Sequence, residues 1–308
     1  MKWKKLGRIF NPDDIKSYWM NSHAAVPFCC SSNEVENKII KIFFSSRDEE
    51  NRSNINWIKY DLEEKKIVEI SKNPILIPGK LGTFDDSGVM GSCLIENNNN
   101  KFLYYIGWNL GKTVPFRNSI GIAKETENGN YEKLYEGPIL DRTKEEPHFV
   151  ASNCVLFDEG IYKIWYLSCV KWEKIENEIR HFYHIKYAES LDGINWERKG
   201  KVAIDFKDEY EYAISVPRVL KIDGKYIMWF SSRGSTEYPS YRIRKAESLD
   251  GVNWNRFNEI ELNVSKEGWD SEMVCYPFVF KYKNKLYMLY NGNGYGKTGI
   301  GLAILEEE

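Results

Sequence analysis

The chain has 308 residues, 42% hydrophobic and 15% aromatic, which is enough for a large core and excludes a disordered chain. Its 43 Lys and Arg nearly balance 45 Asp and Glu, so the formal net charge of -2 gives no bulk signature of nucleic-acid or anionic-membrane binding. No run of about 18 apolar residues occurs, which excludes an ordinary transmembrane helix. We therefore expect neither a nucleic-acid nor a membrane partner.

The cysteines and the N-terminus favour a reducing compartment. The six cysteines are Cys29, Cys30, Cys93, Cys154, Cys169 and Cys275. None belongs to a CxxC pair, and no group of residues has the spacing of zinc ligands, so we interpret them as buried free thiols. No apolar signal-peptide core follows Met1–Phe10. These features predict a cytoplasmic protein without a metal or an organic cofactor.

A repeated strand sets the predicted architecture. Five apolar–aromatic runs, each followed by a small or polar turn, are centred in chain order on Phe44, Tyr105, Tyr166, Phe230 and Tyr290. The steps between these anchors are 61, 61, 64 and 60 residues. Near-equal steps along one chain indicate radial repetition of one supersecondary unit.

Each unit contains further strands around its anchor. An apolar run precedes every anchor, over residues 24–28, 91–95, 152–157, 216–222 and 275–282, and a third run follows four anchors, over 118–123, 184–189, 241–247 and 299–305. Two units then repeat nearly the same words, Ala188–Trp196 and Ala246–Trp254, in which Asp-Gly closes a turn and Trp opens a fourth, outer strand. Four strands in each of five units predict an all-β, five-bladed β-propeller with four-stranded antiparallel blades.

The two chain ends predict closure of this ring. The last unit stops after its third strand at Leu305, and the missing outer strand is found at the other end, where Trp3–Ile9 is similar to Trp196–Val202. An N-terminal strand that completes the last blade removes an open sheet edge. Residues 1–308 are therefore predicted to form a single propeller domain.

Candidate catalytic residues lie in the loops that lead into the innermost strands, because propeller ligands bind in the central concavity. These loops carry carboxylates and aromatic residues, which can protonate a glycosidic oxygen, activate water and stack on a pyranose. Asp85 and Asp86 are adjacent, so only one can face the centre; we favour Asp86 as base, and the alternative is a capped turn before Gly88. Glu272 is the candidate acid, or else a loop carboxylate bound to backbone amides.

The remaining candidates are expected to bind the ligand. They are His23, Trp108, His148, Arg218, Trp269, Asp270 and Tyr276. The two tryptophans and the tyrosine are expected sugar platforms, and each histidine binds ligand, moves a proton or serves loop structure. Arg218 needs an anion, either a substrate carboxylate or phosphate or an internal partner among Glu211, Asp270 and Glu272. Arg47 and Arg233 end two equal Ser-Ser-Arg words and are interpreted as parts of the repeat at the rim.

Three segments resemble a known family. Ser190–Trp196, Tyr287–Gly292 and Phe84–Val89 resemble the five-bladed β-propeller glycosidase superfamily, which includes arabinanases and β-xylosidases, invertases and levansucrases, and β-mannoside phosphorylases. The resemblance covers essentially the whole chain. It is nearest to uncharacterised glycosidase-like members that are linked to bacterial surface-polysaccharide gene sets. Such a resemblance implies the fold more strongly than the substrate.

The sequence departs from this family at the catalytic positions. Phosphorylase-type members carry Gly-Val-Glu-Asp-Pro-Arg, whose Asp is the proton donor, whereas Gly88-Val89 is followed here by Met90-Gly91-Ser92. Arabinanase- and invertase-type members have an Asp before the Pro that is Pro27 here. The equivalent positions of the five blades hold Val26, Gly91, Ser152, Val216 and Tyr276, none of them acidic. Any acid–base pair must come from the loops upstream.

Two functions therefore remain open at the level of sequence. The first is a carbohydrate-active enzyme of glycosidase type that cleaves or transfers a glycosyl group, with Glu272 as acid and Asp86 as base or stabiliser. The second is a non-hydrolytic propeller that binds a glycan, a sugar phosphate or a sugar nucleotide in polysaccharide biosynthesis.

Overall fold

The computed structural model describes residues 2–15, 17–29, 34–97, 100–234 and 238–306, and Cys30 lies outside these ranges. Strands dominate the described residues, with one 3-10 turn, η1 (Pro12–Asp14), and one short helix, α1 (Asn293–Gly296). The all-β prediction is confirmed. In this part of the chain no helix is long and apolar enough to cross a membrane.

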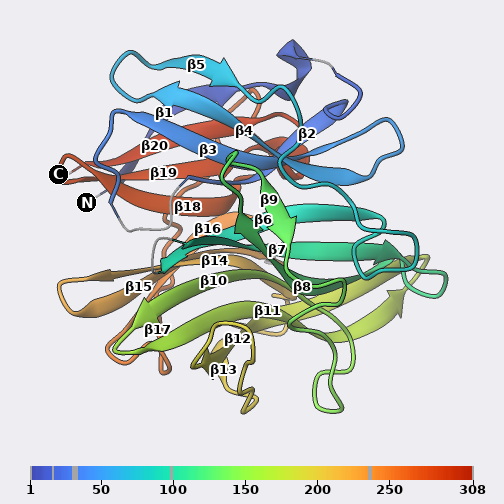
Figure 1. The fold of residues 1–308 in the computed structure, drawn as a ribbon. Helices are drawn as coiled ribbons and strands as arrows, with labels where there is room; N and C mark the ends of the chain where they lie inside the picture. The colour runs from blue at the N-terminus through green and yellow to red at the C-terminus, as the bar shows by residue number, and fades with distance from the viewer. Residues whose placement is uncertain (1, 16, 30–33, 98–99, 235–237, 307–308) are drawn as a thin grey trace.

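The strands form one four-stranded sheet and two eight-stranded sheets. The four-stranded sheet contains, in spatial order, β1 (Lys2–Phe10), β20 (Ile300–Glu306), β19 (Lys285–Asn291) and β18 (Cys275–Tyr282). β1 pairs antiparallel with β20, with Trp3 opposite Leu305, so the two chain ends lie side by side (Figure 1). The N-terminal segment therefore supplies the outer strand of the last sheet, as its similarity to the repeated words predicts.

Each eight-stranded sheet consists of two antiparallel sets of four strands. The first holds β2 (Ser22–Phe28), β3 (Ile39–Arg47), β4 (Ser53–Asp61) and β5 (Lys66–Ile70), then β6 (Gly88–Asn97), β7 (Asn100–Leu110), β8 (Phe116–Glu125) and β9 (Tyr131–Lys133). The second holds β10 (Val150–Asp158), β11 (Ile161–Ile175), β12 (Glu178–Ser190) and β13 (Val202–Ile204), then β14 (Ala213–Ile222), β15 (Lys225–Arg233), β16 (Arg242–Ser248) and β17 (Asn255–Arg256). Only one parallel bridge joins the two sets of each sheet, Ser53 with Gly88 and Tyr183 with Ala213.

We number these groups as strand sets 1 to 5 in the order of β2, β6, β10, β14 and β18, with β1 belonging to set 5. The predicted anchors all lie on the second strand of a set and are fully buried: Phe44, Tyr105, Tyr166, Phe230 and Tyr290. Alternate residues of a strand point to opposite faces, so these aromatic rings pack between neighbouring layers. The repeat seen in the sequence thus marks an equivalent buried position in each strand set.

Tight turns connect the first and second strands of several sets. Asp223 and Gly224 join β14 to β15 with φ of 49° and 79°, and Lys283 and Asn284 join β18 to β19 with φ of 47° and 60°. Two consecutive positive φ angles define the hairpin turn that suits twisted strands and that favours Asn, Asp and Gly. The two turns predicted from these residues are confirmed.

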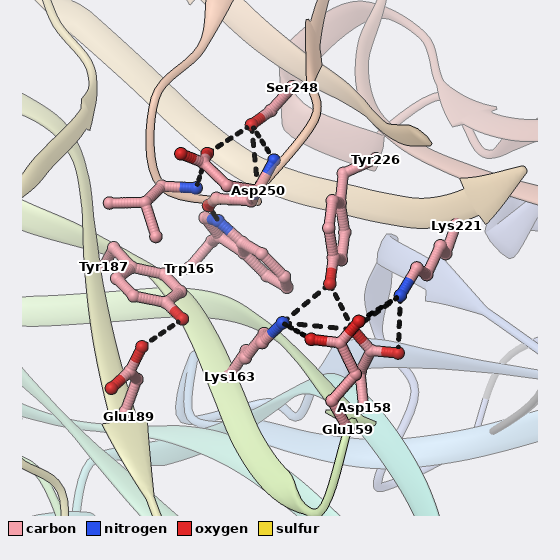
Figure 2. Close-up of polar contacts among 12 residues, drawn as sticks. Asp158, Glu159, Lys163, Trp165, Tyr187, Glu189, Lys221, Tyr226, Ser248 and Asp250 are labelled. Carbon is pink, nitrogen blue, oxygen red and sulfur yellow. Dashed lines mark hydrogen bonds and ion pairs between the residues drawn. The ribbon is translucent and has the colours of Figure 1, made fainter. Parts of the chain in front are cut away.

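The repeated Asp-Gly words cap a turn and bind the neighbouring set. The Asp250 carboxylate accepts hydrogen bonds from the backbone N–H groups of Val252 and Asn253, and Trp165 of set 3 donates from Nε1 to the Gly251 carbonyl at 2.7 Å (Figure 2). The outer strand β17 begins directly after Trp254, as expected. The corresponding strand of set 3 begins only at Val202, because the chain after Trp196 first forms an isolated bridge between Glu189 and Glu197.

A buried ion cluster also ties set 3 to set 4. Asp158 accepts hydrogen bonds from Lys163 at 3.0 Å, from Lys221 at 2.9 Å and from the Tyr226 hydroxyl (Figure 2). The Lys163 side chain is only 6% exposed. Since a buried ammonium group is stable only when it is paired, Asp158 is the group that allows Lys163 to lie there.

Candidate functional site

The first strands of the five sets contact one another, and each carries a β-bulge. At each bulge a backbone N–H donates to a side-chain oxygen of the neighbouring set. The pairs are Val26 to Asn291 at 2.8 Å, Gly91 to Ser45 at 3.1 Å, Asn153 to Ser92 at 2.7 Å, Val216 to Ser152 at 3.0 Å and Tyr276 to Ser231 at 2.7 Å. These hydrogen bonds connect set 5 to set 1 as well as each set to the next.

Three bulge residues hold backbone conformations that are strained for their side chains. Val26, Val216 and Tyr276 have φ of 52°, 48° and 59°, and β-branched or bulky residues rarely adopt such values. Strain of this kind costs about 1–3 kcal/mol and is concentrated at functional positions. The bulges are the positions that the resemblance assigns to catalytic acids, and here they carry no carboxylate.

Several carboxylates of the leading loops are instead buried in a repeated contact, which we call the carboxylate clamp. Asp85 accepts from the Tyr105 hydroxyl at 3.1 Å and pairs with Lys133 of β9 at 2.6 Å. Asp270 accepts from the Tyr290 hydroxyl at 3.1 Å and pairs with Lys5 of β1 at 2.6 Å. Each clamp joins a leading loop, an anchor tyrosine and an outer strand.

Glu146 and Glu211 take the same place in sets 3 and 4. Glu146 accepts from the Tyr166 hydroxyl at 2.9 Å and lies 3.8 Å from Arg198, and Glu211 binds the Arg256 guanidinium through both oxygens. A leading-loop carboxylate thus holds the outer strand in sets 2, 4 and 5, whereas in set 3 its partner Arg198 lies before β13. The structure gives Asp85 and Asp270, predicted as catalytic and ligand-binding residues, these internal partners.

Asp86 makes a different set of contacts from its neighbour Asp85. Its carboxylate accepts from the Gly82 N–H at 3.0 Å, the Ser87 hydroxyl at 2.9 Å and the Asn109 amide at 2.7 Å. Partial burial raises its pKa, but these hydrogen bonds outweigh that effect and lower it. Asp86 is therefore an ionised carboxylate without an ion pair in the described residues, and its contacts are those of a capped turn.

Glu272 is exposed on the loop that precedes β18. Its backbone N–H donates to Asn293 Oδ1 at 2.9 Å, and its carbonyl accepts from Arg242 at 3.2 Å. The loop is thus anchored through the backbone, whereas the carboxylate makes no hydrogen bond or ion pair within the described ranges. The alternative expected from sequence, a carboxylate bound to backbone amides, is not what the structure contains.

His23 lies among positive charges at the start of β2. Its Nδ1 is 2.8 Å from the Ser22 hydroxyl, and burial, together with the charges of Arg47 and Lys297, lowers its pKa to about 4. The imidazole is neutral at pH 7 as a result. Its other nitrogen is a neutral hydrogen-bonding group beside two cations.

An arginine held by tyrosines is a feature that the sequence analysis did not select. The Arg233 guanidinium lies 4.8 Å from the Tyr241 ring centre and 5.1 Å from that of Tyr212. It donates to the Tyr295 hydroxyl at 2.6 Å and to the Tyr183 hydroxyl at 3.4 Å. These five residues come from sets 3, 4 and 5, so the tyrosine cluster joins three sets.

One register feature could have pointed to this cluster. Arg47 is paired with Ser22 and Arg233 with Ala213, the first residues of β2 and β14, and Trp108 is paired with Gly88, the first residue of β6. Identical Ser-Ser-Arg words in two units thus place two guanidinium groups at equivalent points beside the first strands. Trp108 fills that position in set 2, where its Nε1 donates to Ser53 at 2.7 Å.

The other predicted ligand-binding residues lie in different surroundings. Tyr276 lies beside the tyrosine cluster, 6.0 Å from the Tyr241 ring, and burial raises its pKa. Trp269 packs on Tyr290 with ring centres 5.4 Å apart, next to the Asp270 clamp. His148 is half-buried just before β10. The structure therefore brings His23 and Tyr276 near the arginines, and it places Trp269 with the core of set 5.

Arg218 is buried on β14, as expected from its strand position. Its Nε donates to the Val279 carbonyl at 2.9 Å, and its guanidinium lies 4.1 Å from the Phe278 ring centre. Of its three expected acidic partners, Asp270 pairs with Lys5 and Glu211 with Arg256. Arg218 thus links β14 to β18 through the backbone.

Two cavities border the strand sets. One of about 880 Å³ is lined by the β14–β15 and β18–β19 turns, and one of about 680 Å³ lies between residues 74–85 and 130–136, where Asp85 and Lys133 of the set 2 clamp line it. Within the described ranges no three His, Cys, Asp or Glu side chains form a metal-ligand group. The site considered below is therefore defined by its side chains.

Comparison with known proteins gives relatives over the full length. No family model matches the chain. The uncharacterized protein Rv1502 of Mycobacterium tuberculosis is 40% identical over 308 residues, covering 99% of this chain and 100% of Rv1502. This chain belongs to the Rv1502 family. A beta-1,2-mannobiose phosphorylase of Thermoanaerobacter sp. is 30% identical over 131 residues, covering 40% of this chain and 43% of that protein.

Solved structures share the fold of this Rv1502 family member. A thermostable family-43 glycoside hydrolase has a TM-score of 0.70 at 16% identity, covering 93% of this chain and 91% of that chain. A structure from the GH130 family of mannoside phosphorylases has a TM-score of 0.69 at 14% identity, covering 99% and 93%. The chain has the fold of these glycoside hydrolases and phosphorylases, which confirms the predicted resemblance.

Proposed function

We propose that this protein is a carbohydrate-active enzyme of glycosidase type, which binds a sugar where the leading loops meet the first strands. Its fold matches glycoside hydrolases along nearly the whole chain, and 40% of the chain is also similar in sequence to a mannobiose phosphorylase. The observation that carries the proposal is that Asp86 and Glu272 make no ion pair in the described residues, whereas the other candidate acids are held in clamps.

The architecture we propose for this enzyme is a single five-bladed propeller over residues 1–308, closed by β1. The five strand sets are its blades, and their first strands line the axis. This reading is supported by the bulge hydrogen bonds, which continue from set 5 back to set 1 through Asn291 and Val26. It places strained backbone and aromatic side chains at the centre, where propellers bind ligands.

In the proposed reaction Glu272 is the acid and Asp86 is the base or stabiliser. Glu272 protonates the leaving glycosidic oxygen, and the ionised Asp86 carboxylate activates water or stabilises the positive charge that develops at the sugar carbon. The lowered pKa of Asp86 keeps it ionised at neutral pH. No residue at the bulges contributes an acid.

The proposed pair is tested with Asp86→Asn and Glu272→Gln. Oligosaccharides, including β-1,2-mannobiose with and without phosphate, are incubated with the protein, and the products are identified by mass spectrometry. Each substitution is expected to lower kcat/KM for the active substrate more than tenfold, because each removes a proton-transfer or charge-stabilising group. Glu267→Gln, on the same loop as Glu272 and exposed, serves as the matched control. If neither variant loses tenfold, the assigned roles are wrong.

A second candidate function is a non-hydrolytic propeller that binds a sugar in polysaccharide biosynthesis. The absence of acids at the bulges favours it, because related enzymes use those positions for catalysis. A glycan that binds and is recovered with unchanged mass supports this function and contradicts the enzyme. For either function we propose a cytoplasmic location, since Cys93, Cys154, Cys169 and Cys275 are buried thiols without a disulfide bond in the described residues.

A further inference from the structure

Positive charge without a carboxylate partner collects beside the first strands. Arg47 donates to the Asn51 side chain, and Arg233 donates to two tyrosine hydroxyls. Within the described ranges neither arginine makes an ion pair, nor does Lys297, which lies near His23. Four leading-loop acids, Asp85, Glu146, Glu211 and Asp270, are held in the clamps by Lys133, Arg198, Arg256 and Lys5.

The tyrosine cluster also fixes the orientation of Arg233. The rings of Tyr212, Tyr241 and Tyr295 surround the guanidinium at 5.1, 4.8 and 5.7 Å. Tyrosine hydroxyls accept its hydrogen bonds but carry no charge at neutral pH, so the positive charge is not cancelled. Its Nε is buried and has no hydrogen-bond partner among the described residues. A guanidinium group that is held in one orientation and keeps its charge is suited to recognise phosphate or carboxylate.

Tyr276 lies near both arginines, and His23 lies near Arg47. Arg47 is paired with Ser22, the neighbour of His23, and Tyr276 lies 6.0 Å from Tyr241, which contacts Arg233. The electrostatic effects of both arginines reach Tyr276. The neutral imidazole beside Arg47 and the phenol hydroxyls around Arg233 offer hydrogen bonds to a sugar whose charged substituent these arginines hold.

We propose that the ligand of this site is a sugar that carries an oxyanion, a phosphate or a carboxylate, bound by Arg233 and Arg47. This inference rests on the proposed sugar site and specifies its substrate class. Lower local dielectric around the aromatic rings strengthens such a charge-assisted contact relative to one in water. A neutral sugar would leave both guanidinium groups without a counter-charge.

Calorimetric titration of the whole protein tests the inference with four probes: glucose 1-phosphate, glucuronic acid, inorganic phosphate and glucose. At least one of the two sugar anions is expected to bind at least tenfold more tightly than glucose, and the tighter of the two identifies phosphate or carboxylate as the substituent. The preference should shrink as salt is raised, because screening weakens exposed charge contacts. If none of the three anions binds at millimolar concentration, the inference is wrong.

The matched variants are Arg233→Met, Arg47→Met and Arg52→Met. The first two should each weaken binding of the sugar anion at least tenfold while leaving glucose unchanged. Arg52 is exposed and paired with Asp48, so its replacement should change neither. If Arg233→Met does not fold, as judged by its melting curve, Arg47→Met and the salt dependence decide the question. Retention of the anion preference in Arg47→Met would overturn the proposal.

The probes also separate this inference from the proposed function. Equal binding of glucose and the sugar anions contradicts the oxyanion inference and leaves the sugar site intact. Equal binding of phosphate and glucose 1-phosphate supports the arginine site but shows that the sugar contributes nothing, which contradicts the proposed function.

Discussion

Replacing Asp270 by alanine is expected to lower the free energy of unfolding by about 3–5 kcal/mol, the usual effect of removing one partner of a buried ion pair. Its side chain is 2% exposed and pairs at 2.6 Å with Lys5, which is 22% exposed. The substitution removes the counter-charge of the Lys5 ammonium, which keeps its hydrogen bond to Ser265, and it removes the acceptor of the Tyr290 hydroxyl. Urea unfolding followed by tryptophan fluorescence measures the change.

An exposed ion pair between the same two chain ends serves as a control. It shows how much of the stability loss comes from burial of the pair and how much from its charge alone. Lys4 and Glu306 form an exposed ion pair at 3.0 Å between β1 and β20. Glu306→Gln should cost at most about 1 kcal/mol, because solvent screens such pairs. A loss for Asp270→Ala as small as that of the control would show that the clamp does not hold β1 to set 5.

The substitution Asp158→Asn is expected to cost about 2–3 kcal/mol at pH 7. It preserves the shape of the side chain but removes the negative charge that pairs with Lys163 and Lys221. The loss stays below that of Asp270→Ala because Glu159 also lies within 4.0 Å of both lysines and keeps part of the compensation. Glu159→Gln, whose side chain is 73% exposed, is the control and should change the stability by less than about 1 kcal/mol.

The same carboxylate predicts part of the response to acid. Hydrogen bonds from Tyr226, Lys221 and Lys163 outweigh the effect of burial and lower the pKa of Asp158 to about 2. A carboxyl group with a lowered pKa in the folded state stabilises it above the unfolded pKa of about 3.9, and that stability disappears as the pH falls through about 2. Between pH 5 and pH 1 the free energy of unfolding should therefore fall by about 1–2 kcal/mol less in Asp158→Asn than in the wild type. Parallel acid profiles of the two proteins would contradict this assignment.

The strand repeat could be predicted because it depends on local residue patterns. Aromatic anchors, Asp-Gly turns and the similarity between Trp3–Ile9 and Trp196–Val202 each reflect contacts within one set or between neighbouring sets. The predicted run 275–282 coincides with β18, and 216–222 lies within β14. The sequence analysis missed β4, where Asn54 and Asn56 interrupt the apolar pattern because their side chains are buried in a polar network with Ser46.

The site was less predictable, because residue type does not specify a partner far along the chain. Asp85 and Asp86 look alike in the sequence, yet Lys133 of β9 binds the first and Asn109 of β7 the second. Asp270 is held by Lys5, which is 265 positions away. Arg233 was interpreted only as part of a repeated Ser-Ser-Arg sequence. The tyrosines that surround it come from three strand sets, and only the fold brings them together.

The pairing of β1 with β20 also determines the order of events during synthesis. β1 forms its backbone ladder with a strand that is made nearly 300 residues later, so this ladder cannot form until β20 has been synthesised. Contacts of such long sequence separation slow folding, because loop closure must precede the favourable pairing. Nascent chains of this protein therefore expose a strand edge that chaperones or neighbouring nascent chains can bind until β20 is available.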